Sequence, residues 1–149
     1  MSICTGQVVP VSGTIDQPIG ITPNGLVFTR RVIDAAGKPS VTEYAVEKQL
    51  TQFAVVQLRP RTGRAHQLRA HMAWLGYPIV GDKIYGPDER LYIEFIEKGM
   101  TDDMLKKLFL PRHALHATAA TFRHPSTQQF VTVRAPLPAD MEQFIAEHS

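Results

Sequence analysis

The spacing of hydrophobic and polar residues divides the chain into predicted strands and helices. Up to residue 25, glycines and prolines recur too often for a long helix, which predicts short extended pieces and turns. Residues 26–33 and 41–50 are rich in β-branched and aromatic side chains and flank a turn, so we expect them to pair as a hairpin. Residues 53–58 form an apolar run, which predicts a strand covered on both faces.

A helical period replaces this pattern between Thr62 and Gly76. Apolar residues form one stripe along the predicted helix, and Gly76 stands where the helix would stop. The stripe consists of Ala65, Leu68, Met72 and Leu75. A neighbouring face carries His66, Arg69, Ala70 and Ala73. The two alanines leave room for a ligand or another chain segment beside Arg69, and they equally permit close helix–sheet packing.

The later segments alternate between both kinds of element. Residues 87–97 and 101–109 have the composition of two short helices. Residues 116–123 and 128–134 flank a turn and predict a second hairpin. The apolar spacing in residues 140–147 predicts a terminal helix.

The composition is that of an ordinary folded protein. With 149 residues, of which 44% are hydrophobic and 20% charged, the chain is long and apolar enough for one compact domain. Cys4 is the single cysteine, which excludes an internal disulfide and a Cys-based zinc site and favours a reducing cytoplasm. No leader pattern opens the sequence and no apolar run approaches the ~20 residues of a membrane helix, so we expect neither secretion nor membrane insertion.

Charge is unevenly distributed, although the net charge is only +2. No Asp or Glu occurs from Lys48 to Gly81, while several cations do. These are Lys48, Arg59, Arg61, Arg64 and Arg69, together with His66 and His71. Acidic residues gather afterwards, in residues 88–103. An acid-free basic segment is typical of a nucleic-acid-binding face, and a chance cluster of solvated charges is the alternative.

The most specific signature consists of RTGRAHQLRAH at residues 61–71 and LGYPIVGDKIYG at residues 75–86. Three further segments agree with it in order. They are GKP and TEY at residues 37–39 and 42–44, RHALHA at residues 112–117, and FRHP with APLP at residues 122–125 and 135–138. Together these motifs resemble the pattern of the RluA-like family of RNA pseudouridine synthases, and the resemblance covers nearly the whole chain.

The resemblance implies isomerisation of uridine to pseudouridine in structured RNA, with ribosomal RNA as the expected substrate and without a cofactor or metal. It also implies an α+β fold with a mixed, mostly antiparallel sheet carrying helices, which the strand-rich pattern allows. In that family an aspartate of an HRLD motif is the nucleophile, and an arginine keeps it ionised and oriented. By matching position that arginine is Arg69. The expected RNA-binding residues are Arg61, Arg64, His66, Gln67, Lys83, Arg112 and Leu115.

The sequence departs from the family pattern at the nucleophile. No HRLD sequence occurs, and Asp16, Asp34 and Asp82 each lie in a different recognisable segment. Asp82 is adjacent to the basic motif, but the family pattern contains this aspartate in addition to the nucleophile. We therefore expect residues 1–149 to be a single domain, the C-terminal portion of a catalytic domain that lacks the segment with the nucleophilic aspartate and its active-site tyrosine. Such a chain would be inactive alone.

Two other interpretations use the same residues. A non-catalytic RNA-binding module would need only the basic helix face, because phosphate contacts require suitably placed cations and no nucleophile. A purely structural domain would carry the same cations as solvated surface. A metal site at His113 and His116 is disfavoured, since residues three apart in a strand point to opposite faces.

An incomplete catalytic domain also has a consequence for its sheet. Strands without neighbours leave unpaired backbone groups and an apolar face in water. We therefore expect the chain to form a homo-oligomer through this exposed sheet, to exchange strands, or to be poorly soluble.

Overall fold

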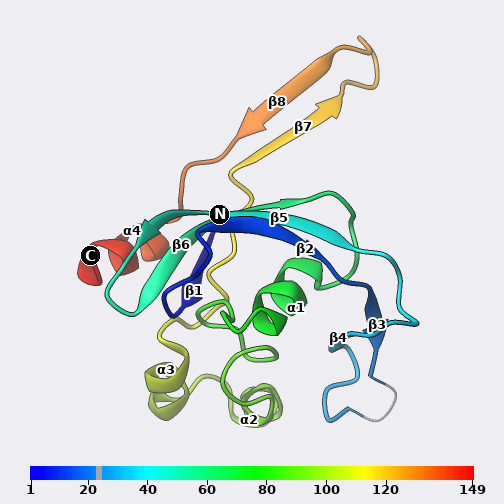
Figure 1. Cartoon of the computed structure of the whole chain (residues 1–149). Coiled ribbons are helices and arrows are strands. Elements are labelled where there is room, and N and C mark those ends of the chain that lie inside the picture. Colours follow the sequence, from blue (N-terminus) through cyan, green and yellow to red (C-terminus); the bar gives the residue numbers. More distant parts are fainter. Residues whose placement is uncertain (23–24) are drawn as a thin grey trace.

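The computed structural model describes residues 1–22 and 25–149, which form an α+β fold of antiparallel sheets and helices (Figure 1). A four-stranded sheet has the order β1-β6-β5-β2, and two small sheets pair β3 with β4 and β7 with β8. The strands are β1 (Ser2–Thr5), β2 (Ser12–Asp16), β3 (Ile19–Ile21), β4 (Arg31–Ile33), β5 (Val41–Gln49), β6 (Phe53–Pro60), β7 (Ala119–Arg123) and β8 (Phe130–Arg134). The helices are α1 (Gln67–Trp74), α2 (Arg90–Lys98), α3 (Asp102–Leu108) and α4 (Ala139–Glu147).

The hydrophobic core surrounds β6, which lies between β1 and β5 in the largest sheet. Residues 53–56 are all buried, so both faces of this strand are covered, as the apolar run predicts. Met72 from α1 and Met141 from α4 are fully buried in the same core. Figure 1 shows α1 beneath the four-stranded sheet, so this helix is held against one face of the sheet.

The predicted pairing of residues 26–33 with residues 41–50 is wrong. Only Arg31–Ile33 of the first segment forms a strand, and that strand pairs with β3. β5 instead pairs with β2 on one side and with β6 on the other, where Tyr44 lies opposite Leu58. The β-branched composition indicated strands correctly, but it carries no information on which strand is the neighbour.

Helix α1 begins at Gln67 and not at Thr62 as predicted. His66 adopts a left-handed backbone conformation with φ 57°, which a helix interior does not allow. The Gln67 side chain holds the preceding loop, because its Oε1 accepts hydrogen bonds from Thr62 Oγ1 at 2.8 Å and from Arg64 N at 3.0 Å. Gly76 has a φ of 92° directly after the helix, which confirms it as the stop.

The later helices agree with their predicted positions to within three residues at each boundary. Helix α3 has Thr101 as its N-cap, with Oγ1 accepting a hydrogen bond from Met104 N at 3.3 Å. Helix α4 buries Met141 and Phe144. No helix of the described residues is long and apolar enough to span a membrane.

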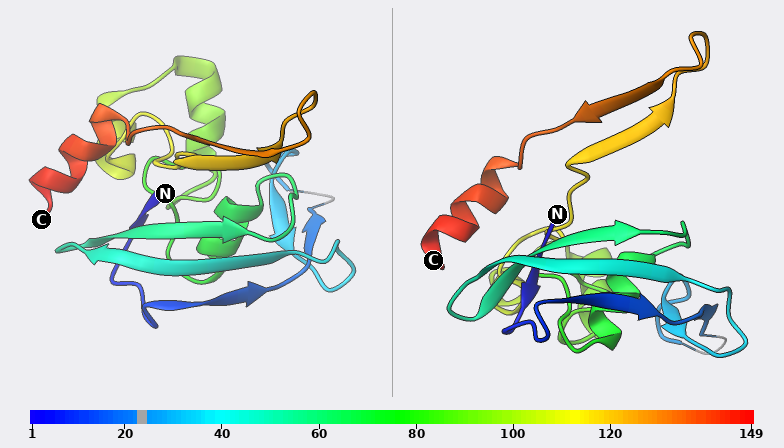
Figure 2. Two further views of the ribbon diagram at one scale, coloured as in Figure 1. Left: turned by 90° about the horizontal axis from the view of Figure 1, so that it is seen from above. Right: turned by 45° about the horizontal axis from the view of Figure 1, so that its top comes forward.

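The β7–β8 hairpin projects away from the rest of the described chain (Figures 1 and 2). Its pairing confirms the second predicted hairpin, although both strands are shorter than expected. Nearly all strand residues are exposed, and the Phe130 side chain is 79% exposed. A lone two-stranded hairpin is marginally stable in water, so this arm leaves apolar surface without cover from the described residues.

Candidate active site

An ion pair between Arg69 and Asp82 forms the centre of the candidate site. Arg69 Nε lies 2.6 Å from Asp82 Oδ2, and Arg69 Nη2 lies 2.8 Å from Asp82 Oδ1. The Asp82 side chain is fully buried and that of Arg69 is 13% exposed. This planar, two-point contact fixes the guanidinium on α1 against the loop that follows the helix.

The same loop holds the carboxylate from its other side. Asp82 Oδ1 also accepts hydrogen bonds from the backbone N–H groups of Ile84 and Tyr85, both at 3.0 Å. Burial alone would raise the pKa of Asp82, but Arg69 and these two amides outweigh burial and lower the pKa below its ordinary value. Burial likewise opposes the charge of Arg69, and Asp82 raises the pKa of that guanidinium. Both groups are therefore charged in the folded protein.

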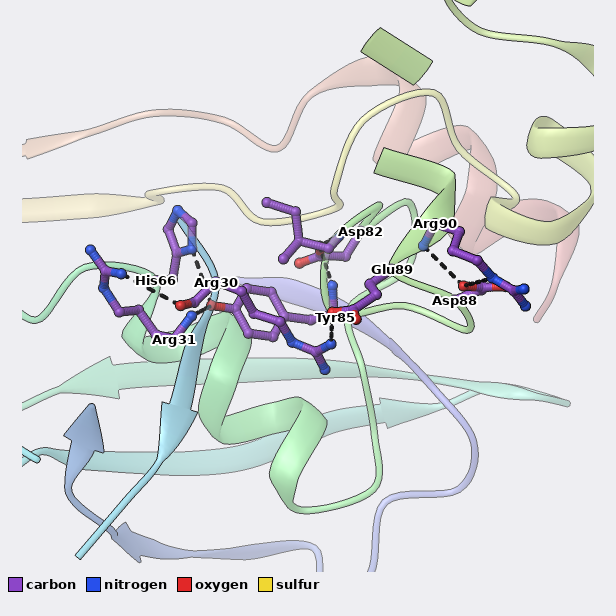
Figure 3. Close-up of polar contacts among 9 residues, drawn as sticks. Arg30, Arg31, His66, Asp82, Tyr85, Asp88, Glu89 and Arg90 are labelled. Atoms are coloured by element: carbon purple, nitrogen blue, oxygen red, sulfur yellow. Dashed lines mark hydrogen bonds and ion pairs between the residues drawn. The ribbon is translucent and has the colours of Figure 1, made fainter. Parts of the chain in front are cut away.

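Tyr85 joins the ion pair to its surroundings. Its hydroxyl accepts a hydrogen bond from Arg31 N at 2.7 Å and lies 3.1 Å from His66 Nδ1 (Figure 3). The Arg69 guanidinium lies 5.0 Å from the centre of the Tyr85 ring, within the range of a cation–π contact. Because the hydroxyl already accepts from Arg31, its own proton is available to His66 Nδ1.

In the arrangement where Tyr85 donates this proton, His66 is the acceptor at Nδ1. Burial, followed by the positive charges of Arg69 and Arg31, lowers the pKa of His66. A neutral ring that accepts from Tyr85 at Nδ1 carries its proton on Nε2. The left-handed backbone at His66 directs this residue out of the helical line of α1 and toward Tyr85.

A buried polar network supports the first turn of α1 from below. Gln67 Nε2 donates to Val41 O at 2.9 Å and to Thr42 Oγ1 at 3.0 Å. Thr42 Oγ1 lies 2.9 Å from His71 Nδ1, and His71 Nε2 lies 2.9 Å from Gln17 O. Gln67 was predicted to lie near the RNA, but it is buried and its amide is fully used inside the protein, which gives it a structural role in this structure.

Two cavities of about 390 Å³ each meet at Arg69. Both are lined by His66, Arg69 and His113. The first continues toward Lys83, and the second continues toward Arg64, Gln67 and Leu115. The structure thus brings together six of the eight residues predicted for the site.

The remaining predicted cations have partners of their own. Arg61 makes a two-point contact with Glu43, with both distances at 2.9 Å. Arg112 Nη2 lies 2.7 Å from Asp140 Oδ1. Neither arginine lines the cavities at Arg69. Lys83 does line one of them, but its Nζ donates to a backbone carbonyl at 2.6 Å and lies over the Phe95 ring.

Sequence reasoning did not assign Tyr85 or His113 to the site. Tyr85 lies in the motif of residues 75–86 and His113 in the motif of residues 112–117, so motif membership was the available signal. Partial burial, and then the charge of Arg69, lowers the pKa of His113. Among the residues that the structure describes, no group of three or more His, Cys, Asp or Glu side chains is placed to hold a metal ion.

Comparison with known proteins points to one family. The model of that family, RNA pseudouridylate synthase, matches residues 4–74. Ribosomal large subunit pseudouridine synthase D of Haemophilus ducreyi is 33% identical over 139 residues, which cover 93% of this chain and 41% of that protein. The Vibrio cholerae protein of the same name is 38% identical over 130 residues, covering 87% of this chain and 38% of that protein.

Solved structures agree with the sequence matches. Human RNA Pseudouridylate Synthase Domain Containing 1 has a TM-score of 0.70 at 25% identity, over 98% of this chain and 62% of that chain. Human RNA Pseudouridylate Synthase Domain Containing 4 has a TM-score of 0.64 at 26% identity, over 93% of this chain and 56% of that chain. Fold and motifs therefore define a relative of RNA-modifying isomerases. Over most of its length the chain is similar to RNA pseudouridine synthases, and it spans about two fifths of the curated relatives named above.

Proposed function

We propose that this chain supplies the Arg69 side of an active site that converts uridine to pseudouridine in RNA, with ribosomal RNA as the substrate. One observation carries the proposal. Asp82 holds two nitrogens of Arg69, while the third, Nη1, makes no hydrogen bond with any described residue, and Arg69 lines both cavities. A fixed guanidinium with one free edge can orient a second carboxylate. We also propose a cytoplasmic location, where Cys4 would stay reduced.

The reaction requires such a carboxylate and no redox partner. The bond between N1 of uracil and C1′ of ribose breaks, the base turns, and a bond between C5 and C1′ forms. The hydrogen on C5 leaves to solvent and N1 takes up a proton, so the product is an isomer of the substrate. A carboxylate beside Arg69 would act as the nucleophile, because a neighbouring guanidinium favours its ionised form.

Asp82 is unsuited to be that nucleophile. Its two oxygens accept four hydrogen bonds, and its side chain has no exposed surface. We propose that residues 1–149 form one domain that corresponds to the C-terminal portion of a catalytic domain, and that the nucleophilic aspartate comes from a separate HRLD-type segment. The chain alone is then inactive.

Tritium release from [5-³H]uridine-labelled ribosomal RNA tests this proposal. The chain alone is compared with the same chain joined to a segment that carries the HRLD-type aspartate. We expect release only from the joined protein. Release by the chain alone would overturn the account and make Asp82 the first residue to replace, whereas RNA binding with no release from either protein would favour the non-catalytic RNA-binding module.

Arg69→Lys in the joined protein separates catalysis from binding. Lysine keeps the charge but cannot contact two carboxylates through a planar fork, so we expect turnover to fall much more than RNA affinity. Arg90→Lys is the matched control, because Arg90 makes a similar two-point contact with Asp88 on the exposed surface. Equal loss of turnover and affinity in Arg69→Lys would point to a binding role.

We further propose that the β7–β8 hairpin mediates a homo-oligomer of the isolated chain. The hairpin exposes Phe122, Phe130 and Val133, and its edges have no strand neighbours among the described residues. Phe130→Ser should shift the isolated chain toward monomer in sedimentation velocity, with Phe109→Ser, at an exposed phenylalanine outside the hairpin, as the control. A monomer at high concentration in the unmodified chain would contradict this proposal.

A further inference from the structure

A third cavity, of about 500 Å³, lies between the β3–β4 hairpin and the loop before α1. Its walls include Arg31 from β4, Lys38 from the turn before β5, and Gly63 and Arg64 from the loop. None of the expectations from sequence placed Arg31 or Lys38 at a binding site. This volume is within the range of pockets that bind small ligands, and it is large enough for one nucleotide unit.

The cavity is strongly cationic. Arg64 donates from Nε to Pro39 O at 3.2 Å, which leaves its two terminal nitrogens free of partners among the described residues. Lys38 Nζ likewise has no partner in the described part of the chain. The one carboxylate in the wall, Asp34, accepts a hydrogen bond from the Ala36 backbone at 2.9 Å and pairs with none of the cations. Three cations therefore face one anion.

The walls of this cavity are built by backbone contacts and need no ligand to form. Lys38 and Ile19 exchange two backbone hydrogen bonds, each 2.9 Å long. A side-chain carbon on Gly37 would lie 2.4 Å from the Ile19 carbonyl carbon, so only glycine permits this close approach. Arg31 thus lies on the paired strand β4, and Lys38 is held by an isolated β-bridge to Ile19.

The cationic cavity adjoins the candidate active site along the loop before α1. Gly63 and Arg64 line both the cationic cavity and the cavity that contains Arg69. A side-chain carbon on Gly63 would meet no atom within 4 Å, so the space beside this shared wall residue is open. A polymer with regularly spaced phosphates could occupy both cavities at once, which a single small anion could not.

We propose that the cationic cavity binds the phosphate and ribose of a nucleotide that neighbours, along the RNA strand, the nucleotide at Arg69. This inference rests on the proposed function. A phosphodiester offers only acceptor oxygens, which suit the free donors of Lys38 and Arg64. Arg31 donates from Nη1 to Arg30 O at 3.4 Å, and its other side-chain nitrogens have no partner among the described residues. Apolar walls from Ile19 and Ala65 would pack against the sugar. A free nucleotide has the same phosphate chemistry, and the experiment distinguishes the two sources.

Binding of a fluorescent oligouridylate to the whole chain, followed by anisotropy at several salt concentrations, tests the inference. Each lost phosphate contact on a single strand lowers the slope of log affinity against log salt by about 0.7. Lys38→Ala and Arg31→Ala should each lower this slope by that amount. Between 50 and 200 mM salt, the affinity of each variant should then fall by a factor about three times smaller than that of the unmodified chain. Lys107→Ala, which removes the same charge from an exposed position on α3, should leave the slope unchanged.

A second variant and a second ligand complete the experiment. Gly63→Leu should weaken binding of the oligonucleotide more than binding of uridine 5′-monophosphate, because Gly63 lines both cavities and only the oligonucleotide would occupy both. If Lys38→Ala and Arg31→Ala behave like Lys107→Ala, the cationic cavity is not a strand site, while the proposed function stands. If Lys38→Ala and Arg31→Ala weaken binding of the monophosphate but not of the oligonucleotide, the cationic cavity binds free nucleotides and the assignment to an RNA strand is wrong. If the unmodified chain binds no oligonucleotide, the proposed function and this inference both fail.

Discussion

Replacing Asp82 with alanine should destabilise the folded chain severely. The substitution leaves the Arg69 guanidinium largely buried without its counter-charge, and it also removes the acceptor for the Ile84 and Tyr85 backbone amides. Breaking a buried ion pair by removing one partner costs about 3–5 kcal/mol. For a chain of this size each kcal/mol lowers the melting temperature by about 2–4 °C, so the expected decrease is about 6–20 °C.

Asp88→Ala is the matched control for this substitution. Asp88 also contacts an arginine through two nitrogens and accepts a backbone N–H, but its partner Arg90 is exposed. Solvent screens that pair, so we expect a much smaller change in stability. The two variants therefore differ mainly in burial.

Urea unfolding monitored by circular dichroism measures both variants, together with Asp82→Asn. Asparagine can still accept from the Ile84 and Tyr85 amides but carries no charge, so it should fall between the native protein and Asp82→Ala. Equal unfolding free energies for Asp82→Ala and Asp88→Ala would refute the reasoning that the ion pair at Arg69 is a buried structural element.

Two further outcomes follow from buried groups elsewhere in the fold. Burial lowers the pKa of His71 below its unfolded value of 6.5, so its contribution to stability is complete above pH 6.5 and is lost as the pH falls from there through the lower pKa of the folded state. The urea midpoint should therefore drop as the pH falls from 7.5 to 5.5, and it should drop less in His71→Gln. An unchanged pH dependence in that variant would contradict this. Gly81→Ala should lower the melting temperature strongly, because Gly81 has a φ of 77° and the new carbon would lie 1.9 Å from Arg112 O, whereas Gly63→Ala meets no atom and should change little.

The hydrophobic pattern predicted the kinds of element better than their neighbours. The apolar run of residues 53–58 identified a strand that is buried on both faces, and Gly76 marked the end of α1. The start of α1 was predicted five residues early, because nothing in the pattern indicated that the Gln67 side chain would hold the preceding loop. Local spacing indicates which side of an element is apolar. Contacts between residues distant in the sequence determine which strands pair and where a helix begins.

In the candidate site, too, the local motif was predictable and the contacts between distant segments were not. The motif identified Arg69, but its partner within the described chain is Asp82, thirteen residues further along. His113 reaches the same cavities from a distant segment, and only the folded chain brings it there. Gln67, in the same motif, is used inside the protein. A motif therefore indicates where functional residues occur along the chain, and it does not distinguish a supporting side chain from one that faces a ligand.

The Arg69–Asp82 pair also bears on the entropy of substrate binding. A free arginine side chain can lose about 2 kcal/mol of rotamer entropy when a ligand fixes it. Because Asp82 already fixes Arg69 in the folded chain, that loss of freedom occurs during folding and not during the encounter with RNA. A substrate or a second carboxylate that contacts Arg69 Nη1 would thus meet a side chain with one orientation, and its binding free energy would not be reduced by ordering the arginine.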